Sequence, residues 1–187
     1  MTQRRAAFLD RDGVLNVDHG YVFRPQDFEW LPGAIDALLL LQQAGYVLVV
    51  VTNQSGVARG FYTLADVEKL HLHLRTTLLA AGVQLAGMYA CPHHPDGVVP
   101  EYRVQCACRK PMPGMIEQAA REHGLDLAAS CLFGDKTSDI EAGRRAGVGR
   151  CWLLGQQAGS SDADGRASSL LCAVQAVLQA VGRAGAP

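Results

Sequence analysis

Two carboxylates near the start of the chain are separated by one residue and followed by a glycine. Asp10, Asp12 and Gly13 come directly after the apolar residues 6–9. A short apolar run bounded by turn residues predicts a buried strand, and open α/β sheets bind their ligands at the carboxyl ends of strands. Two carboxylates this close repel each other unless a cation lies between them or one of them binds a proton. An ordinary turn is the alternative, because Asp and Gly are common turn residues.

A second group of reactive side chains lies in a loop-like segment and consists of two close pairs, Cys91 with His93 and Cys106 with Cys108. Three thiolates and one imidazole can close a tetrahedral zinc site, and four protein ligands would make the zinc structural. His94 is a competing ligand, and a metal-free loop of reduced cysteines is the alternative. Zinc here would fix the loop that carries Arg109 and Lys110, because both cations directly follow Cys108.

The elements that must position these groups alternate between strands and helices. Apolar and β-branched runs predict strands at residues 6–9, 46–51, 87–90, 130–133 and 150–154. Start and stop signals predict helices at residues 34–44, 63–81, 113–123, 138–146 and 169–181. This alternation predicts an α/β fold with a Rossmann-like, doubly wound parallel sheet. Residues 155–168 predict a flexible connection, and the tail after residue 181 is expected to fray.

Smaller signals predict local structure within this frame. Capping boxes are expected at two helix starts, Thr63 with Asp66 and Ser138 with Glu141. Small core residues are expected at three cysteines that sit singly among apolar neighbours, Cys131, Cys151 and Cys172.

Size and charge narrow the class of protein. With 187 residues, 49% of them hydrophobic, the chain suits one domain at 1–187, with a core at about 6–154 and a zinc loop at 91–108. We expect no separate cap domain, because no insertion is large enough. The net charge of −1 gives no overall attraction for nucleic acid or an acidic membrane. No apolar run predicts a membrane span and no secretory leader is evident, so we expect a cytoplasmic monomer without disulfides.

Polar residues end several of the predicted strands, and parallel strands bring their carboxyl ends to one edge of the sheet. The residues expected to converge there are Asp10, Asp12, Thr52, Asn53, Asp135 and Lys136, with Arg109 and Lys110 from the cysteine-rich loop. Carboxylates from two strands suit Mg²⁺, a hard cation that prefers oxygen ligands and phosphate. Hydroxyl, amide and ammonium groups suit the oxygens of a transferring phosphoryl group. The pattern therefore predicts phosphoryl chemistry.

These motifs resemble those of the haloacid dehalogenase-like (HAD-like) phosphatases, in the expected order over about residues 6–154. The matching features are the DxDG at Asp10, the Thr after the second strand at Thr52, the Lys before a helix at Lys110, and the GDxxxD at 134–139 that holds Asp135 and Asp139. The resemblance implies that Asp10 attacks phosphorus and forms an aspartyl phosphate, and that Asp12 acts as acid and base. It implies that Mg²⁺ binds Asp10, the backbone carbonyl of Asp12, and Asp135. Thr52, Asn53 and Lys110 would stabilise the transferring phosphoryl group.

The cysteine segment is similar to the zinc loop of one branch of this superfamily, which favours His93 over His94 as the fourth ligand. Residues 16–22 and 52–60 are similar to members that remove the 7-phosphate of heptose 1,7-bisphosphate, with histidinol phosphate as the alternative substrate. Substrate contacts are then expected from Asp18, His19, Tyr21, Asn53, Gln54, Ser55, Arg59, Arg109 and Lys136. Arg109 can bind a second phosphate bidentately. A plain turn at residues 18–20, a binding module that has lost catalysis, and a phosphoryl-transferring mutase are the remaining alternatives.

Overall fold

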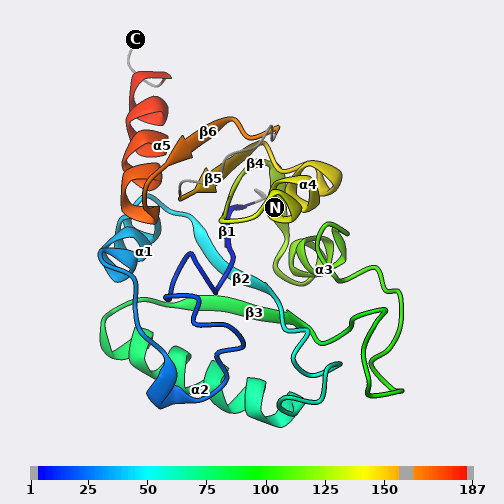
Figure 1. Cartoon of the computed structure of the whole chain (residues 1–187). Coiled ribbons are helices and arrows are strands. Elements are labelled where there is room, and N and C mark those ends of the chain that lie inside the picture. Colours follow the sequence, from blue (N-terminus) through cyan, green and yellow to red (C-terminus); the bar gives the residue numbers. More distant parts are fainter. Residues whose placement is uncertain (1–3, 156–161, 185–187) are drawn as a thin grey trace.

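Six parallel strands form one sheet, and helices cover both of its faces (Figure 1). The computed structural model describes residues 4–155 and 162–184. The strands are β1 (Arg4–Leu9), β2 (Val47–Asn53), β3 (Leu85–Cys91), β4 (Leu125–Gly134), β5 (Arg150–Leu154) and β6 (Gly165–Ala167). The helices are α1 (Ala34–Gln43), α2 (Leu64–Ala80), α3 (Gly114–His123), α4 (Thr137–Ala146) and α5 (Leu170–Ala184), with a 3₁₀ turn, η1 (Pro25–Asp27).

The central strand β1 explains why helices are needed on both faces. Ala7 and Leu9 pack into a cluster with residues of α1 and α5, whereas Ala6 and Phe8 pack with residues of α3 and α4. Successive side chains of a strand point to opposite faces, so a strand covered on both sides is apolar at every position. All four side chains are fully buried.

The strand order places the functional loops together. The order is β3-β2-β1-β4-β5-β6, so β2 and β4 pair with opposite sides of β1. In such sheets the order reverses beside the first strand, and the crevice outside the carboxyl ends at that point binds ligands. The loops after β1, β2 and β4 meet in this crevice.

The predicted doubly wound parallel sheet is confirmed, and each predicted strand and helix is present within the described ranges. The capping box of α2 is also confirmed. The Asp66 N–H donates to Thr63 Oγ1 at 3.2 Å, and the Thr63 N–H donates to Asp66 Oδ2 at 2.8 Å. The chain therefore enters α2 as its local sequence predicts.

The predicted capping box of α4 is wrong. The helix begins at Thr137, one residue before the expected start, and this shift changes which acidic residue can reach back. Asp139, and not Glu141, accepts the hydrogen bond of the residue before the helix, from the Lys136 N–H at 3.0 Å. The same residue also faces the sheet edge described below.

Three predictions in the C-terminal part also need correction. The connection at 155–168 contains a short strand, β6, which pairs in parallel with β5 and covers an edge that would otherwise expose unpaired backbone groups. The tail was expected to start after residue 181, but α5 continues to Ala184. Residues 156–161 and 185–187 lie outside the described residues. Cys131 and Cys151 are buried as predicted, but Cys172 is exposed on α5, so it is not a core residue.

Long loops, and not an inserted domain, cover the carboxyl edge in the part of the chain that the structure describes. Residues 10–33 connect β1 to α1 and contain only the turn η1, and residues 92–113 connect β3 to α3. Among the described residues, no helix combines the length and apolar character needed to cross a membrane. The crevice is thus shaped by these two loops and by the segment between β2 and α2.

Candidate active site and zinc cluster

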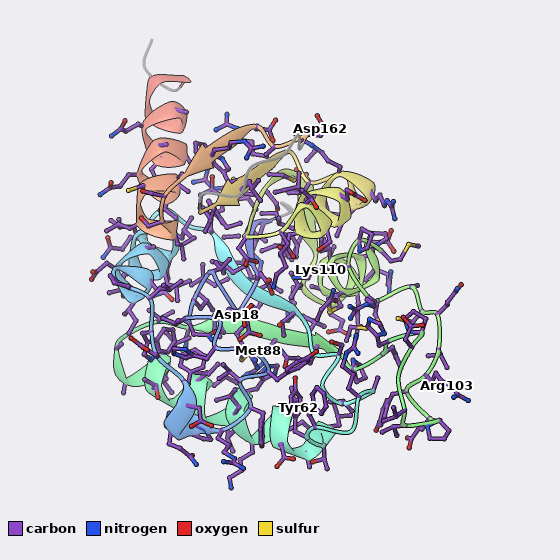
Figure 2. All side chains as sticks on the ribbon, in the orientation of Figure 1. Asp18, Tyr62, Met88, Arg103, Lys110 and Asp162 are labelled. Carbon is purple, nitrogen blue, oxygen red and sulfur yellow. The ribbon has the colours of Figure 1, made fainter. Side chains whose placement is uncertain are left out.

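A buried ammonium group joins three parts of the carboxyl edge. Lys110 is labelled in Figure 2; its Nζ lies 2.9 Å from Asp10 Oδ1 and 2.6 Å from Asp139 Oδ1, and it donates to the Val51 carbonyl at 2.8 Å. Burial alone would lower the pKa of Lys110, but the two carboxylates outweigh it, and the pKa lies above its ordinary value. Lys110 therefore stays charged and ties the loop after β1 and the first turn of α4 to β2.

Three carboxylates gather beside this ammonium group. Asp10, Asp135 and Asp139 can place oxygen atoms within 4.8 Å of one another. Lys110 pairs with two of them, whereas Asp135 Oδ1 is buried and has no hydrogen-bond partner among the described residues. Burial, followed by repulsion from Asp10, raises the pKa of Asp135 to about 7. Crowded carboxylates with an unpartnered oxygen fit a hard divalent cation such as Mg²⁺.

A glycine allows this acidic group to form. Gly13 has a φ of +84°, and a Cβ at this position would lie 2.4 Å from Asp135 Oδ2. Any other residue would meet the carboxylate and would also need a left-handed backbone. The Gly of the DxDG motif is therefore required by the close approach of the loops after β1 and β4.

The carboxylate of Asp12 lies in a different environment from that of Asp10. It does not belong to the acidic group and instead accepts hydrogen bonds from Arg11, Asn16 and Gln54. Its side chain is 15% exposed. The two carboxylates of the DxD motif are thus separated into one that faces the acidic group and one that does not.

The polar residues at the carboxyl end of β2 serve as supports in this structure. The Asn53 amide donates to the Lys110 carbonyl and accepts from the Lys110 N–H, each at 3.0 Å. Thr52 is buried and accepts from Gln54 Nε2 at 2.9 Å. Asn53 therefore holds the backbone of Lys110 against β2, and Thr52 lies next to the Asp12 network.

A cleft of about 290 Å³ opens next to Asp12, and Figure 2 labels two of its lining residues, Asp18 and Tyr62. The predicted substrate residues that line it are Asp18, Tyr21, Asn53, Gln54, Ser55 and Lys136. Lys136 Nζ lies 3.3 Å from Asp18 Oδ2 and 3.8 Å from Asp135 Oδ2, so it connects the cleft with the acidic group. The cleft therefore offers hydroxyl, amide, carboxylate and ammonium groups to a polar ligand.

Three predicted substrate residues lie outside this cleft. His19 lines a neighbouring cavity and pairs with Glu29 at 3.0 Å. Arg59 Nη2 lies 3.2 Å from His94 Nε2, and Arg109 Nη1 donates to the His93 carbonyl at 3.2 Å. The two arginines are therefore held by adjacent histidines of the zinc loop.

The predicted zinc ligands form one cluster. The three Sγ–Sγ distances among Cys91, Cys106 and Cys108 are 3.1, 3.3 and 3.6 Å, and His93 Nδ1 lies 3.3 Å from Cys108 Sγ. Sulfur atoms bound to one tetrahedral zinc lie about 3.8 Å apart, so the donor set fits this ion. His94 is turned toward Arg59. The cluster of three cysteines and His93 therefore offers a closed set of four ligands for a structural zinc, and it ends two residues before Lys110.

Sequence reasoning missed Arg11, Asn16 and Tyr62, and it quoted Asp139 as part of a motif without giving it a role. Arg11 stands between the two motif carboxylates and is fully buried, where a guanidinium needs a partner. The position of Arg11 between the two motif carboxylates was the one feature of the sequence that could have indicated its role. Nothing in the local pattern marks Tyr62, because its contact with Gln54 depends on the path of the loop before α2.

Comparison with known proteins identifies related chains. A HAD-hydrolase-like family model matches residues 107–170. A D-glycero-alpha-D-manno-heptose-1,7-bisphosphate 7-phosphatase of Photorhabdus laumondii is 45% identical over 150 residues, which cover 80% of this chain and 82% of that protein. A D-glycero-beta-D-manno-heptose-1,7-bisphosphate 7-phosphatase of Escherichia coli K12 is 51% identical over 144 residues, covering 77% and 75%.

A solved structure agrees with these relatives. The crystal structure of D,D-heptose 1,7-bisphosphate phosphatase from B. bronchiseptica, complexed with magnesium and phosphate, superimposes with a TM-score of 0.82. It is 34% identical in sequence and covers 94% of this chain and 99% of that one. The fold and the acidic edge, together with these matches, define a HAD-like phosphatase. At this level of identity, the chain belongs to the D-glycero-D-manno-heptose-1,7-bisphosphate 7-phosphatase family.

Adjacent histidines provide a matched test of the zinc site. We expect His93→Ala to lose most of the bound zinc, because the imidazole completes the tetrahedral set. His94→Ala should retain it, because His94 contacts Arg59 instead. Metal analysis of the purified variants measures this directly. Equal zinc content in the two variants would contradict the assignment of the fourth ligand.

The raised pKa of Asp135 predicts a pH-dependent stability of the Mg²⁺-free protein. Its folded-state pKa of about 7 exceeds the ordinary value of 3.8, so its contribution is fully present below pH 3.8 and is lost as the pH rises through about 7. The Tm in buffer without Mg²⁺ should therefore fall between about pH 4 and about pH 7, and less so in Asp135→Asn. Added Mg²⁺ should stabilise wild type more at the higher pH. An identical dependence of Tm on pH in the two proteins would contradict the raised pKa of Asp135.

Proposed function

We propose that this chain removes the 7-phosphate of D-glycero-D-manno-heptose 1,7-bisphosphate, in the synthesis of heptose precursors for lipopolysaccharide. The relatives named above act on this compound by name, in its alpha or beta form. The observation that carries the proposal is the separation of Asp10 and Asp12 into two environments at one sheet edge, next to a polar cleft. Two carboxylates with different surroundings can serve as nucleophile and as acid/base.

In the first step, a carboxylate oxygen of Asp10 attacks phosphorus and forms an aspartyl phosphate, which is an acyl phosphate. The bond from phosphorus to the O7 of the sugar breaks, and the departing alkoxide takes a proton from Asp12. Lys110 lies 2.9 Å from Asp10 Oδ1, so its charge stabilises the ionised nucleophile and the developing charge on the phosphoryl oxygens.

In the second step, water attacks phosphorus and gives its proton to Asp12. The bond to Asp10 breaks, which restores its carboxylate and releases inorganic phosphate. Asp12 therefore returns to its protonated state and each turnover consumes one water molecule. Its position beside the cleft, and not within the acidic group, gives it access to both the leaving oxygen and the water.

Mg²⁺ held by Asp10, Asp135 and the Asp12 carbonyl would supply positive charge that offsets the phosphate and the crowded carboxylates. The unpartnered oxygen of Asp135 and its raised pKa support this ligand set. Asp139 pairs with Lys110 and would hold the ammonium group in place rather than bind the ion. The zinc cluster would keep the loop at Arg109 and Lys110 in register with β2.

The substrate residues follow from the cleft and its rim. Asp18, Ser55 and Lys136 can hydrogen-bond to sugar hydroxyls, and the half-exposed ring of Tyr21 can pack on the sugar. Arg109 and Arg59 are available for the phosphate on C1, with His19 farther along the rim. Histidinol phosphate is the second candidate substrate, and the carboxylate of Asp18 would suit its ammonium group.

We also propose that the chain acts as a cytoplasmic monomer. Each residue assigned above comes from one chain, so no second copy is needed to complete the site. The cluster of three unpaired cysteines suits a reducing compartment.

A substrate comparison tests the proposal. With Mg²⁺, kcat/KM should be highest for heptose 1,7-bisphosphate and should drop for histidinol phosphate. Arg109→Met should lower kcat/KM for the bisphosphate by roughly 10- to 100-fold, because charged hydrogen bonds contribute about 1.5–3 kcal/mol. The same variant should change hydrolysis of histidinol phosphate little. A higher kcat/KM for histidinol phosphate, or equal losses with both substrates, would contradict the assignment.

A further inference from the structure

We propose that Arg11, Asn16, Gln54 and Tyr62 form a buried shell whose task is to position the carboxylate of Asp12 for proton transfer. We call this set the Asp12 shell. The inference rests on the proposed function, in which Asp12 is the acid and base. It assigns positioning roles to four side chains, none of which has to touch the reacting atoms.

Arg11 anchors the shell. It is the largest fully buried side chain of the described residues, and its Nη2 lies 3.0 and 2.9 Å from the two carboxylate oxygens of Asp12. The same nitrogen donates to the Val22 carbonyl at 2.6 Å, and the Arg11 N–H donates to Asp10 Oδ1 at 2.8 Å. A buried guanidinium is costly unless it is paired, so the fold holds Asp12 close to Arg11. One residue thereby fixes both motif carboxylates.

Asn16 and Gln54 contact Asp12 from two further directions. Asn16 Nδ2 donates to Asp12 Oδ1 and to the Val17 carbonyl, at 3.0 and 2.8 Å. Gln54 Nε2 donates to Asp12 Oδ2 at 3.0 Å. Both side chains are buried, and together with Arg11 they engage both carboxylate oxygens. Asp12 is therefore restrained in rotation as well as in position, and is kept apart from the acidic group.

Tyr62 determines which way the Gln54 amide points. Its hydroxyl donates to Gln54 Oε1 at 2.8 Å, which leaves Nε2 to face Asp12 and Thr52. Burial raises the pKa of Tyr62 to about 12, so the hydroxyl remains a donor. The ring stacks on Phe23 with centroids 4.9 Å apart, and a Cβ on Gly56 would lie 2.2 Å from it. Packing thus fixes the ring, and the ring fixes the amide.

If the Asp12 shell only stabilised the fold, its variants would differ kinetically from variants that misplace the Asp12 carboxylate. A sugar alkoxide needs a proton to leave, whereas p-nitrophenolate leaves without one. Formation of the Asp10 acyl phosphate from p-nitrophenyl phosphate therefore does not need Asp12 as acid. Hydrolysis of that acyl phosphate needs Asp12 as base with either substrate. Misplacing Asp12 should therefore slow only the second step with the aryl substrate.

The experiment is stopped-flow release of p-nitrophenolate by zinc- and Mg²⁺-loaded wild type, Tyr62→Phe and Gln54→Leu. We expect both variants to show a burst of phenolate approaching one equivalent per site, followed by a steady rate about tenfold below wild type, as part of the roughly 10²–10⁴-fold that acid–base catalysis contributes. Leu74→Ala is the matched control, because Leu74 belongs to the buried apolar cluster that contains Val22, whose carbonyl accepts from Arg11. It should lose stability and show no new burst.

The outcomes separate this inference from the function it rests on. Variants that lose the burst rate and the steady rate equally, or that match wild type, would overturn the positioning role of the Asp12 shell. A wild type without Mg²⁺-dependent phosphate release from any phosphate ester would instead overturn the proposed function. Arg11→Met is a further variant expected to show the slowest steady rate after its burst, and Tyr62→Phe keeps the test valid if Arg11→Met does not fold.

Discussion

The concentration of carboxylates at the buried carboxyl edge of the sheet is the constraint on which this structure depends. Asp10, Asp135 and Asp139 place carboxylate oxygens within 4.8 Å of one another, and burial makes their repulsion costly. One buried cation, Lys110, offsets part of this charge. The negative charge that Lys110 does not offset favours binding of a divalent cation, and such a cation suits phosphate chemistry. The supporting features keep Lys110 in place: Asn53 clamps its backbone, and the zinc cluster ends two residues before it.

The same edge places the two carboxylates of one short motif in different surroundings, which suit the two roles proposed for them. Asp10 points into the acidic group beside Lys110, whereas Asp12 is drawn toward Arg11 and away from that group. A nucleophile must stay ionised, and an acid/base must exchange its proton with the cleft. The spacing of the motif allows this because β1 ends at Leu9, and the tight turn that follows directs the two side chains apart. The local backbone geometry after β1 therefore determines which surroundings each carboxylate has.

Much of the fold and of the candidate site could be predicted from the sequence, because strand ends in a parallel sheet share one edge. The polar residues after β1, β2 and β4 could be grouped without coordinates for that reason. The Asp12 shell could not, since the orientation of Gln54 depends on a hydroxyl eight residues away that reaches it only through tertiary packing. The short strand β6 was not predicted because its residues are small or polar. The cap of α4 lies at Lys136 and not at Ser138, so Asp139 replaces Glu141 as the residue that reaches back to it.

The most direct measurement locates the phosphoryl group during turnover. Acid quenching of the enzyme within a single turnover of heptose 1,7-bisphosphate, followed by peptide mass spectrometry, should find an alkali-labile phosphoryl group on Asp10. The group should be absent from Asp10→Asn. Phosphate release by Asp10→Asn at the wild-type rate, or a phosphoryl group on any other residue, would contradict the account of this site.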